Sequence, residues 1–395
     1  MIQQNDFSLK QSTLELFKKQ FRQLPNIITR SPGRINIIGE HTDYNEGFVL
    51  PAAINRYAYI AVGERDDNLI HLYAVEYTEL LVFNLNDLGQ KKSSWTDYII
   101  GIVDQLKQTR CKLNGFNLLL DSDLPIGAGM SSSAAIECAT IFALNDLFKA
   151  KISKLSMVKM AQKAEHTFTG VQCGIMDMFA SVFGKQNQVI KLDCRSLDFA
   201  YMPLLMGSKQ MLLLNTNVKH SLASSAYNER KQQCEQGVAW VKEKYPEVNS
   251  LRDITIEMLN LMVAPKDPII YKRCQYVIEE NNRLLTACEA LKKGDLVTLG
   301  RLMFETHMQL SKLYEVSCKE LDFLVKQVKK YPSVLGARMM GGGFGGCTIN
   351  LVETTAIPAL VQILKPAYRE ATGLDLSVYA VGVTNGTETL INNTC

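Results

Sequence analysis

The chain has 395 residues, of which 47% are hydrophobic and 21% charged, as in an ordinary folded globular protein. Its 43 basic and 40 acidic residues nearly balance, which argues against a nucleic-acid or membrane partner. The ten cysteines form no CxxC pair, so neither a zinc ribbon nor a thioredoxin-like motif is expected. Free thiols in this number, without an apolar signal core or a membrane-length apolar run, predict a cytoplasmic location. No heptad pattern stands out, and we expect a monomer.

Strand-like and helix-like patterns alternate along the first 200 residues. In chain order they predict strands at 57–63, 70–75 and 80–85, a helix at 97–108, a strand at 116–120, helices at 131–148 and 154–168, and a strand at 189–193. After a strand at 211–215, the patterns predict helices at 224–244, 267–293, 296–315 and 319–330, and strands at 348–352 and 377–383. This mixture predicts an α+β fold of two lobes, residues 1–205 and 206–395, with mixed or antiparallel sheets.

The segment 123–137, DLPIGAGMSSSAAIE, lies between a predicted strand and a predicted helix. Gly127 and Gly129 allow the backbone to approach a ligand closely, and Ser131, Ser132 and Ser133 stand where the helix begins. Free N–H groups and a positive dipole at a helix start bind phosphate. A P-loop is excluded because no lysine follows Gly129. A Rossmann motif needs an acidic residue at the end of a second strand about 20 positions on, and Asp146, at roughly that spacing, lies inside the predicted helix. A glycine turn with ordinary serine caps stays open as the alternative.

A second glycine cluster occupies residues 341–346 and reads GGGFGG. It formally matches GxGxxG, but it leads into the predicted strand at 348–352 and not into a helix, so the Rossmann interpretation fails here too. So many glycines suit a loop that packs against another backbone or a ligand. A purely structural loop beside a strand remains equally open.

Charged side chains cluster near the N-terminus, where Glu40, His41 and Asp43 follow an apolar triplet. Carboxylates at a strand end can accept hydrogen bonds from several sugar hydroxyls, and Arg34 could stabilise a phosphoryl group in transfer. A solvated turn with local salt bridges is the alternative.

Two further carboxylates lie between residues 165 and 177. Asp177 stands alone in an apolar stretch, where it could receive a hydroxyl proton or merely cap a helix. Glu165 is a hard oxygen ligand suited to Mg²⁺, or an exposed helix glutamate.

Taken together, these segments resemble the galactokinase family of the GHMP small-molecule kinases. The similarity rests on five stretches in this order: 33–45, 125–134, 173–177, 225–230 and 341–346. It implies two lobes with the active site between them. It also implies transfer of the γ-phosphoryl group of ATP, with Mg²⁺, to the anomeric hydroxyl of α-D-galactose, the first committed step of galactose catabolism by the Leloir pathway.

The resemblance also implies a role for each matching residue. Asp177 would be the catalytic base, and Arg34 would stabilise the transition state. The sugar would contact Glu40, His41, Thr42, Asp43, Gly174 and Tyr227. ATP would contact Gly127, Ala128, Gly129, Met130, Ser131, Ser132 and Ser133. Mg²⁺ would be held by Ser133 and Glu165.

Three positions depart from the usual family pattern. Met178 stands where Gln is common, Met340 where Thr is common and His166 where Asn is common. A related kinase acting on N-acetylgalactosamine or arabinose is one alternative, although Thr42 favours galactose. A non-catalytic galactose and ATP sensor is another, but such sensors lose part of the serine run, which is intact here at 131–134.

Overall fold

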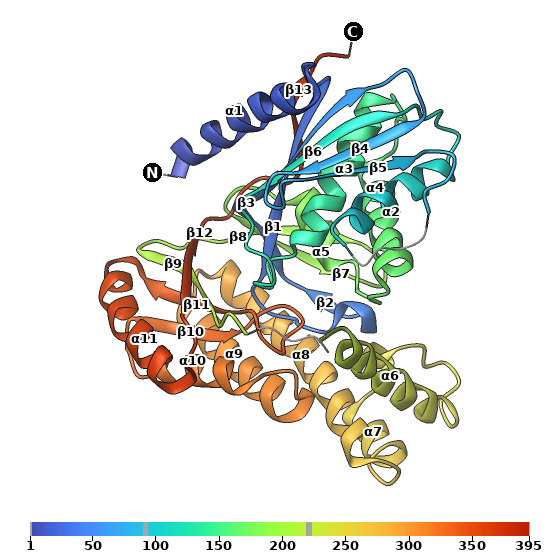
Figure 1. Ribbon diagram of the computed structural model, residues 1–395. Coiled ribbons are helices and arrows are strands. Elements are labelled where there is room, and N and C mark those ends of the chain that lie inside the picture. The colour runs from blue at the N-terminus through green and yellow to red at the C-terminus, as the bar shows by residue number, and fades with distance from the viewer. Residues whose placement is uncertain (1, 90–93, 219–222, 395) are drawn as a thin grey trace.

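The computed structural model describes residues 2–89, 94–218 and 223–394, which form two lobes of mixed helices and sheets (Figure 1). The N-terminal lobe is built on a six-stranded sheet in the order β13-β1-β3-β6-β4-β5. Its strands are β1 (Ile27–Asn36), β3 (Pro51–Glu64), β4 (Leu69–Ala74), β5 (Glu79–Asn84), β6 (Phe116–Ser122) and β13 (Glu388–Asn392). All pairings in it are antiparallel except that of β4 with β6, so the sheet is mixed as predicted.

Both faces of this sheet are covered, because successive side chains of a strand point to opposite sides. Leu118 on β6 packs into the main core, whereas its neighbour Leu119 packs with Phe17 of α1 (Ile2–Phe21) on the other face. The helices of this lobe are α2 (Thr96–Lys107), α3 (Ser132–Leu147), α4 (Lys154–Ala164) and α5 (Met176–Phe183). Of these, α3 lies directly on β1 and β3.

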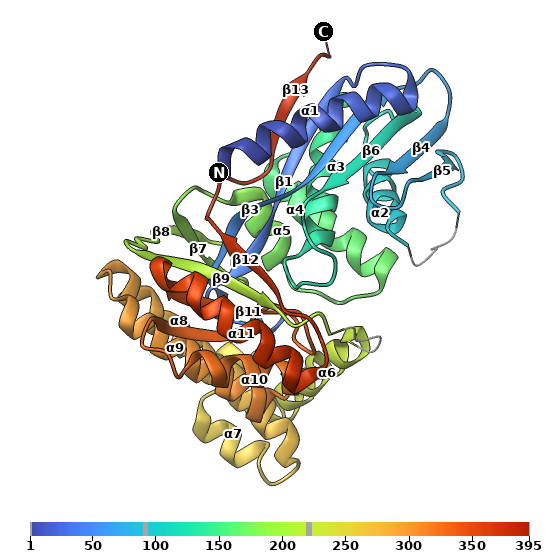
Figure 2. The same cartoon turned by 60° about the vertical axis from the view of Figure 1, so that its left-hand side comes forward.

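The C-terminal lobe contains a four-stranded antiparallel sheet in the order β10-β11-β9-β12 (Figure 2). Its strands are β9 (Lys209–Asn215), β10 (Val334–Met339), β11 (Cys347–Glu353) and β12 (Ser377–Val381). Its helices are α6 (Ala223–Lys242), α7 (Ile256–Met262), α8 (Pro268–Lys292), α9 (Leu296–Gln309), α10 (Lys319–Val328) and α11 (Ile357–Thr372). A small sheet of β2 (Phe48–Val49), β7 (Gln188–Asp193) and β8 (Phe199–Pro203) contacts α8 between the lobes.

The two lobes are tied together by the path of the chain. After β12 in the C-terminal lobe, β13 returns to the N-terminal lobe and pairs with β1, with Ile27 opposite Asn392. Arg30 of β1 also forms an ion pair with Glu388 at 2.6 Å. The lobe boundary near Leu205 stays a prediction. Strand β13, although it follows the C-terminal lobe in the sequence, belongs to the sheet of the N-terminal lobe.

Two predicted helices end differently from expectation. The helix predicted to reach residue 168 is α-helical only to Ala164 and continues as a π-helical turn, η2 (Glu165–Thr169). The helix predicted to reach residue 315 ends as α9 at Gln309 and continues as the π turn η4 (Leu310–Tyr314). A π turn keeps the apolar pattern of a helix while adding a residue to it, so periodicity alone does not reveal it.

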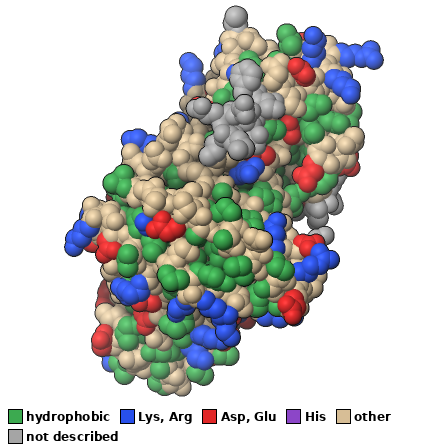
Figure 3. Space-filling model, turned by 90° about the vertical axis from the view of Figure 1, so that its left-hand side faces the viewer, with side chains coloured by type: hydrophobic (Ala, Val, Ile, Leu, Met, Phe, Trp, Pro, Cys, Tyr) green, Lys and Arg blue, Asp and Glu red, His purple; other side chains and the backbone are tan. Residues whose placement is uncertain are grey.

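The surface agrees with the balanced composition. Acidic and basic side chains are interspersed over the face shown in Figure 3. Within the described ranges, no helix combines the length and apolar composition that crossing a bilayer needs.

Candidate active site

Arg34 lies near the end of β1, where the register with β3 shifts between Pro32 and Arg34. Such bulges re-aim side chains beside active sites. The intervening Gly33 has no room for a side chain, because a Cβ there would lie 2.6 Å from the carbonyl oxygen of Met130. Glycine therefore lets the strand pass directly against the predicted phosphate loop. Arg34, only 4% exposed as a whole residue, lines the polar cavity described below.

The guanidinium of Arg34 binds Asp177 through two parallel bonds, Nε to Oδ1 at 2.8 Å and Nη2 to Oδ2 at 3.0 Å. Its remaining Nη1 donates to the carbonyl of Gly129 at 2.6 Å. Burial lowers the pKa of Arg34, but the charges of Asp177 and Glu40 outweigh that effect and the pKa is raised. Arg34 is therefore a fixed positive charge that joins the phosphate loop to Asp177.

Asp177 stands in the first turn of α5, where a carboxylate is favoured by the helix dipole. Besides the two bonds from Arg34, its Oδ2 accepts a hydrogen bond from the hydroxyl of Ser131 at 2.5 Å. Ser131 is the N-cap of α3 in a left-handed conformation, with φ +57°, and makes no side-chain cap bond. Its hydroxyl thus faces the predicted base, which the assignment of Ser131 to ATP alone did not anticipate.

The predicted phosphate loop leads from β6 to the N-terminus of α3. Gly127 and Gly129 have φ angles of +71° and +74°, which glycine adopts without strain, and open space adjoins Gly127. The two glycine-rich segments pack against each other. A Cβ on Gly341 would lie 3.3 Å from the carbonyl oxygen of Gly129, and one on Gly346 would lie 3.4 Å from the backbone of Ala128. The second glycine loop therefore packs closely against the backbone of the first, one of the uses that its composition suggested.

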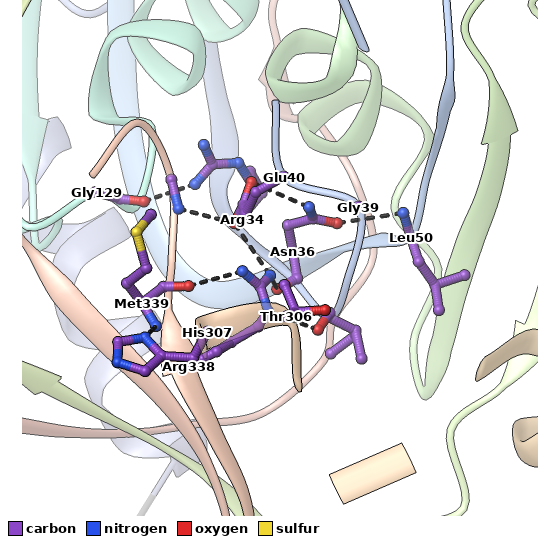
Figure 4. A network of polar contacts seen from close by, with 12 residues as sticks. Arg34, Asn36, Gly39, Glu40, Leu50, Gly129, Thr306, His307, Arg338 and Met339 are labelled. Carbon is purple, nitrogen blue, oxygen red and sulfur yellow. Dashed lines mark hydrogen bonds and ion pairs between the residues drawn. The ribbon is translucent and has the colours of Figure 1, made fainter. Parts of the chain in front are cut away.

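Glu40 joins the two lobes through a buried charge network (Figure 4). Its Oε1 accepts hydrogen bonds from Arg338 at 3.0 Å and from the amide of Gly341 at 2.8 Å. Its Oε2 accepts a bond from Asn36 at 3.1 Å. Burial raises the pKa of Glu40, but Arg338 and Arg34 outweigh it, and the pKa is lowered. The carboxylate thereby positions the start of the glycine loop opposite Arg34.

A cavity of about 260 Å³ opens between these groups. It is lined by Arg34, Glu40, His41, Asp43, Glu165, Val171, Cys173, Gly174, Met176, Asp177, Tyr227 and residues 341–344. All the predicted sugar-contacting residues except Thr42 are among them. A volume of this size, with several carboxylates and an imidazole in its wall, suits a small polyhydroxylated ligand.

Two residues show how the cavity wall is shaped. Gly174 touches Asp43, because a Cβ on Gly174 would lie 1.8 Å from the Oδ2 of that carboxylate. Thr42 is fully buried, and its hydroxyl lies 2.9 Å from the carbonyl of Gly39 and 2.6 Å from that of Phe48. The structure therefore places Thr42 in the fold of the turn and not on the cavity surface, which differs from the expectation.

The protonation state of Asp43 is expected to make sugar binding in this cavity depend on pH. Burial raises its pKa to about 7, with help from the negative charge of Asp177. A protonated carboxyl loses acceptor sites for sugar hydroxyls. Sugar KM is therefore expected to fall as pH rises towards 7 and to level off above it. Steady-state KM between pH 5.5 and 8.5 measures this, and Asp43→Asn should remove the dependence. A wild-type KM that is flat across this range would contradict it.

Glu165 lines the 260 Å³ cavity, and its carboxyl interacts with the hydroxyl of Ser133 at the start of α3. Glu165 is the first residue of the π turn η2. Burial, helped by the negative charge of Asp177, raises its pKa to about 7, and hydrogen bonds from the Cys173 and Ser133 side chains only partly offset this rise. The carboxylate of Glu137 on α3 is fully buried, and neither of its oxygens has a hydrogen-bond partner among the described residues. Two buried carboxyl groups and a hydroxyl, with no described cation beside the unpartnered Glu137, supply hard oxygen donors in negatively charged surroundings, and this donor set fits Mg²⁺.

A second cavity of about 590 Å³ adjoins the phosphate loop and was not predicted from the sequence. Its lining includes Ser132, Ile136 and the aromatic residues Tyr77, Trp95 and Tyr98. The rings of Tyr77 and Trp95 stack at 16° with centroids 6.3 Å apart. Flat aromatic walls beside a phosphate loop suit a nucleotide base. The available sequence signal was Trp95, one of only two tryptophans in the chain, two residues before the helix predicted at 97–108.

The three departures from the family pattern lie around these cavities. His166 Nε2 lies 2.7 Å from the carbonyl of Cys173 and so supports the segment before Asp177. Met178 and Met340 are fully buried in the hydrophobic core. None of the three side chains lines the 260 Å³ cavity.

Three family models match the chain. The galactokinase galactose-binding signature matches residues 15–64, the GHMP kinases N terminal domain residues 97–185, and the GHMP kinases C terminal domain residues 287–368. The first covers Arg34 and the segment 40–43, and the second covers the phosphate loop, Glu165 and Asp177.

Curated relatives and solved structures extend this similarity to nearly the whole chain. The chain is 41% identical to a galactokinase of Thermotoga maritima over 91% of its length and 99% of the relative. It is 40% identical to a galactokinase of Clostridium acetobutylicum, over 94% and 97%. The structure of Lactococcus lactis galactokinase complexed with galactose matches with a TM-score of 0.92, at 32% identity, over 97% of this chain and 100% of that one. A mevalonate kinase of Methanococcus jannaschii shares the fold, with a TM-score of 0.66 at 19% identity, over 91% and 99%.

Proposed function

The chain belongs to the galactokinase family of the GHMP kinases, and we propose that it transfers the γ-phosphoryl group of ATP to the anomeric hydroxyl of α-D-galactose. The products are galactose 1-phosphate and ADP. The observation that carries this proposal is the pairing of Arg34 with Asp177, which joins the phosphate loop to the wall of the polar cavity.

In this proposal, each residue of the polar cavity has a separate role in the reaction. Phosphoryl transfer demands positioning and charge stabilisation more than covalent chemistry. Asp177 faces the cavity and accepts the proton of the sugar hydroxyl as the new P–O bond forms. Arg34, held between Asp177 and the Gly129 carbonyl, places its charge where the transferred group gains negative charge. The acidic wall formed by Glu40 and Asp43 accepts hydrogen bonds from the remaining hydroxyls.

The nucleotide and its metal occupy the neighbouring space. The free N–H groups at the start of α3 bind the phosphates, and the aromatic cavity holds the base. Ser133 and Glu165 would hold Mg²⁺, which neutralises phosphate charge when bound.

An ADP-release assay across a sugar panel tests the substrate assignment. Galactose is expected to give the highest kcat/KM among galactose, its epimers, N-acetylgalactosamine and arabinose. Higher kcat/KM for one of the other sugars would reassign the substrate within the family. Binding of galactose and ATP without ADP release would identify a sensor instead.

Trp95→Ala tests the nucleotide cavity separately. Removing one wall of the base site is expected to raise KM for ATP by about tenfold, because a base–aromatic stack contributes about 1–3 kcal/mol. KM for galactose should stay within about twofold, since Trp95 does not line the polar cavity. Initial rates with each substrate varied in turn measure both constants. A selective rise in the galactose KM would place the base elsewhere.

Two further properties belong to this proposal. The described cysteines are all free thiols, which supports a cytoplasmic protein. We also propose a monomer, which sedimentation at micromolar concentration would test.

A further inference from the structure

The helix α8 of the C-terminal lobe binds both ends of the segment 39–48, which supplies three residues of the polar cavity wall. The fully buried Glu280 accepts a hydrogen bond from the amide of Gly39 at 2.8 Å through its carboxylate. One position further along α8, the side-chain oxygen of Asn281 accepts from the amide of Phe48 at 2.8 Å. The two ends of the segment are therefore held by contacts of their own, whatever the residues between them do.

A third side chain of α8, that of Tyr276, reaches the interior of the same segment. Its hydroxyl donates to the carbonyl of Glu40 at 2.9 Å. Tyr276 is fully buried, and its ring packs on that of Tyr314 with the centroids 4.7 Å apart. Tyr276 is not among the residues that line the 260 Å³ cavity. An effect of its hydroxyl on a ligand there must therefore pass through the segment.

The carbonyl that Tyr276 binds belongs to the peptide group between two residues of the cavity wall, Glu40 and His41. His41 has a left-handed backbone conformation with φ +59°, which costs a non-glycine residue free energy. Because a peptide group is rigid and planar, turning this one over by about 180° would bring the φ of His41 to about −120°, in the ordinary β region. The same turn would point the Glu40 carbonyl away from Tyr276. The hydrogen bond from Tyr276 thus opposes a relaxation that the backbone of His41 favours.

We propose that Tyr276 is a positioning residue for the sugar, because its hydroxyl holds the peptide group between Glu40 and His41 in the strained orientation that completes the cavity wall. Galactose binds this orientation, and the apparent affinity for it falls in proportion to the fraction of molecules that are competent to bind. Saturating galactose restores the competent orientation, so the loss is seen in KM and not in kcat. This inference rests on the proposed function, because the ligand it concerns is the sugar of that reaction.

Tyr276→Phe removes the hydroxyl and keeps the ring. Galactose KM is expected to rise about three- to tenfold, the effect of one lost hydrogen bond, with kcat and the KM for ATP within about twofold. Tyr368→Phe is the matched control, because Tyr368 is equally buried and its hydroxyl bonds the Thr216 carbonyl within the C-terminal lobe. The control should leave all three constants unchanged. An unchanged galactose KM in Tyr276→Phe would overturn the proposal, and so would a fall in kcat as large as the rise in KM, which would show a general loss of structure.

A glycine at position 41 tests whether the hydroxyl acts through the strained backbone. His41→Gly raises galactose KM by itself, because the imidazole leaves the cavity wall, but glycine adopts a positive φ without strain. Neither orientation of the peptide group is then favoured once the hydroxyl is absent, and about half of the molecules stay competent. Adding Tyr276→Phe to His41→Gly should therefore raise galactose KM by no more than about twofold. A further rise of three- to tenfold would overturn the proposal.

The orientation of the peptide group is also observable without turnover. In crystals of Tyr276→Phe grown without sugar, the φ of His41 is expected to be negative, whereas wild-type crystals should keep it near +59°. A φ near +59° in the variant would overturn this inference and leave the proposed function untouched. A wild-type enzyme that does not phosphorylate galactose would instead overturn the proposed function.

Discussion

Asp177→Asn is expected to lower kcat by about 10²–10⁴-fold, the usual contribution of a positioned base. The amide has nearly the same shape, and its oxygen at the Oδ2 position can still accept from Nη2 of Arg34 and from Ser131. The amide nitrogen loses the bond from Nε of Arg34, and the side chain cannot take a proton from the sugar hydroxyl. ATP affinity should be close to that of the wild type, since Asp177 lines the polar cavity and not the aromatic one. Single-turnover phosphoryl transfer and nucleotide titration measure the two quantities.

Ser131→Ala is the matched control for that variant. It removes one hydrogen bond from Asp177 and leaves both the carboxylate and the two bonds from Arg34 in place. Its kcat should fall by no more than about tenfold, in line with the loss of a single hydrogen bond. If Asp177→Asn kept near wild-type turnover, Asp177 would orient the hydroxyl without receiving its proton. If the kcat of Ser131→Ala fell as far as that of Asp177→Asn, the Ser131 hydroxyl would contribute as much to catalysis as the Asp177 carboxylate, and the role of base would not be specific to Asp177.

Arg338→Met is expected to destabilise the fold by about 3–5 kcal/mol, the cost of leaving one partner of a buried ion pair uncompensated. The Arg338 side chain is fully buried, and its guanidinium donates to Glu40 at 3.0 Å, to the Ile37 carbonyl at 2.9 Å and to the Met339 carbonyl at 2.7 Å. It also donates to the Asn36 carbonyl. Removing the guanidinium leaves these three carbonyl oxygens and the Glu40 carboxylate buried without their hydrogen-bond donor. Urea unfolding of the variant and the wild type measures the loss.

Arg301→Met provides the comparison on the surface. Arg301 pairs with Glu305 one helical turn away, and its side chain is 59% exposed. Exposed pairs contribute about 0–1 kcal/mol, so this variant should unfold close to the wild type. Adding Glu40→Gln to Arg338→Met removes the stranded charge and should recover part of the stability. A loss below about 1 kcal/mol in Arg338→Met would show that water reaches the network.

The sequence located the parts of the site that carry local signals. The glycine and serine residues at 127–133 predict a phosphate-binding loop by their composition alone, and Asp177 is recognisable as a single charged residue among apolar ones. Their meeting was not derivable from spacing, because Arg34 and Asp177 are separated by 143 positions in the chain. The resemblance to a kinase family placed both residues in one active site, and the structure shows the two hydrogen bonds that join them.

The missed parts are those whose role depends on three-dimensional neighbours. Arg338 lies in the short strand β10, and the residues around it in the sequence give no sign that its side chain is buried against Glu40. Trp95 and Tyr77 come from separate segments and form a wall only when the sheet and α2 are assembled. Ser131 was assigned to ATP from its place at a helix start, and its bond to Asp177 appears only when α3 and α5 are packed together.

The return of β13 to β1 has a consequence for synthesis on the ribosome. Strand β1 is complete early, but its partner at Glu388–Asn392 is made more than 350 residues later, because the pairing of Arg30 with Glu388 spans 358 positions. At about 5–20 residues per second, the unpaired edge of β1 waits for roughly 20 to 70 seconds. An exposed strand edge is a template for wrong pairing, so the nascent chain carries an aggregation hazard that the finished enzyme lacks.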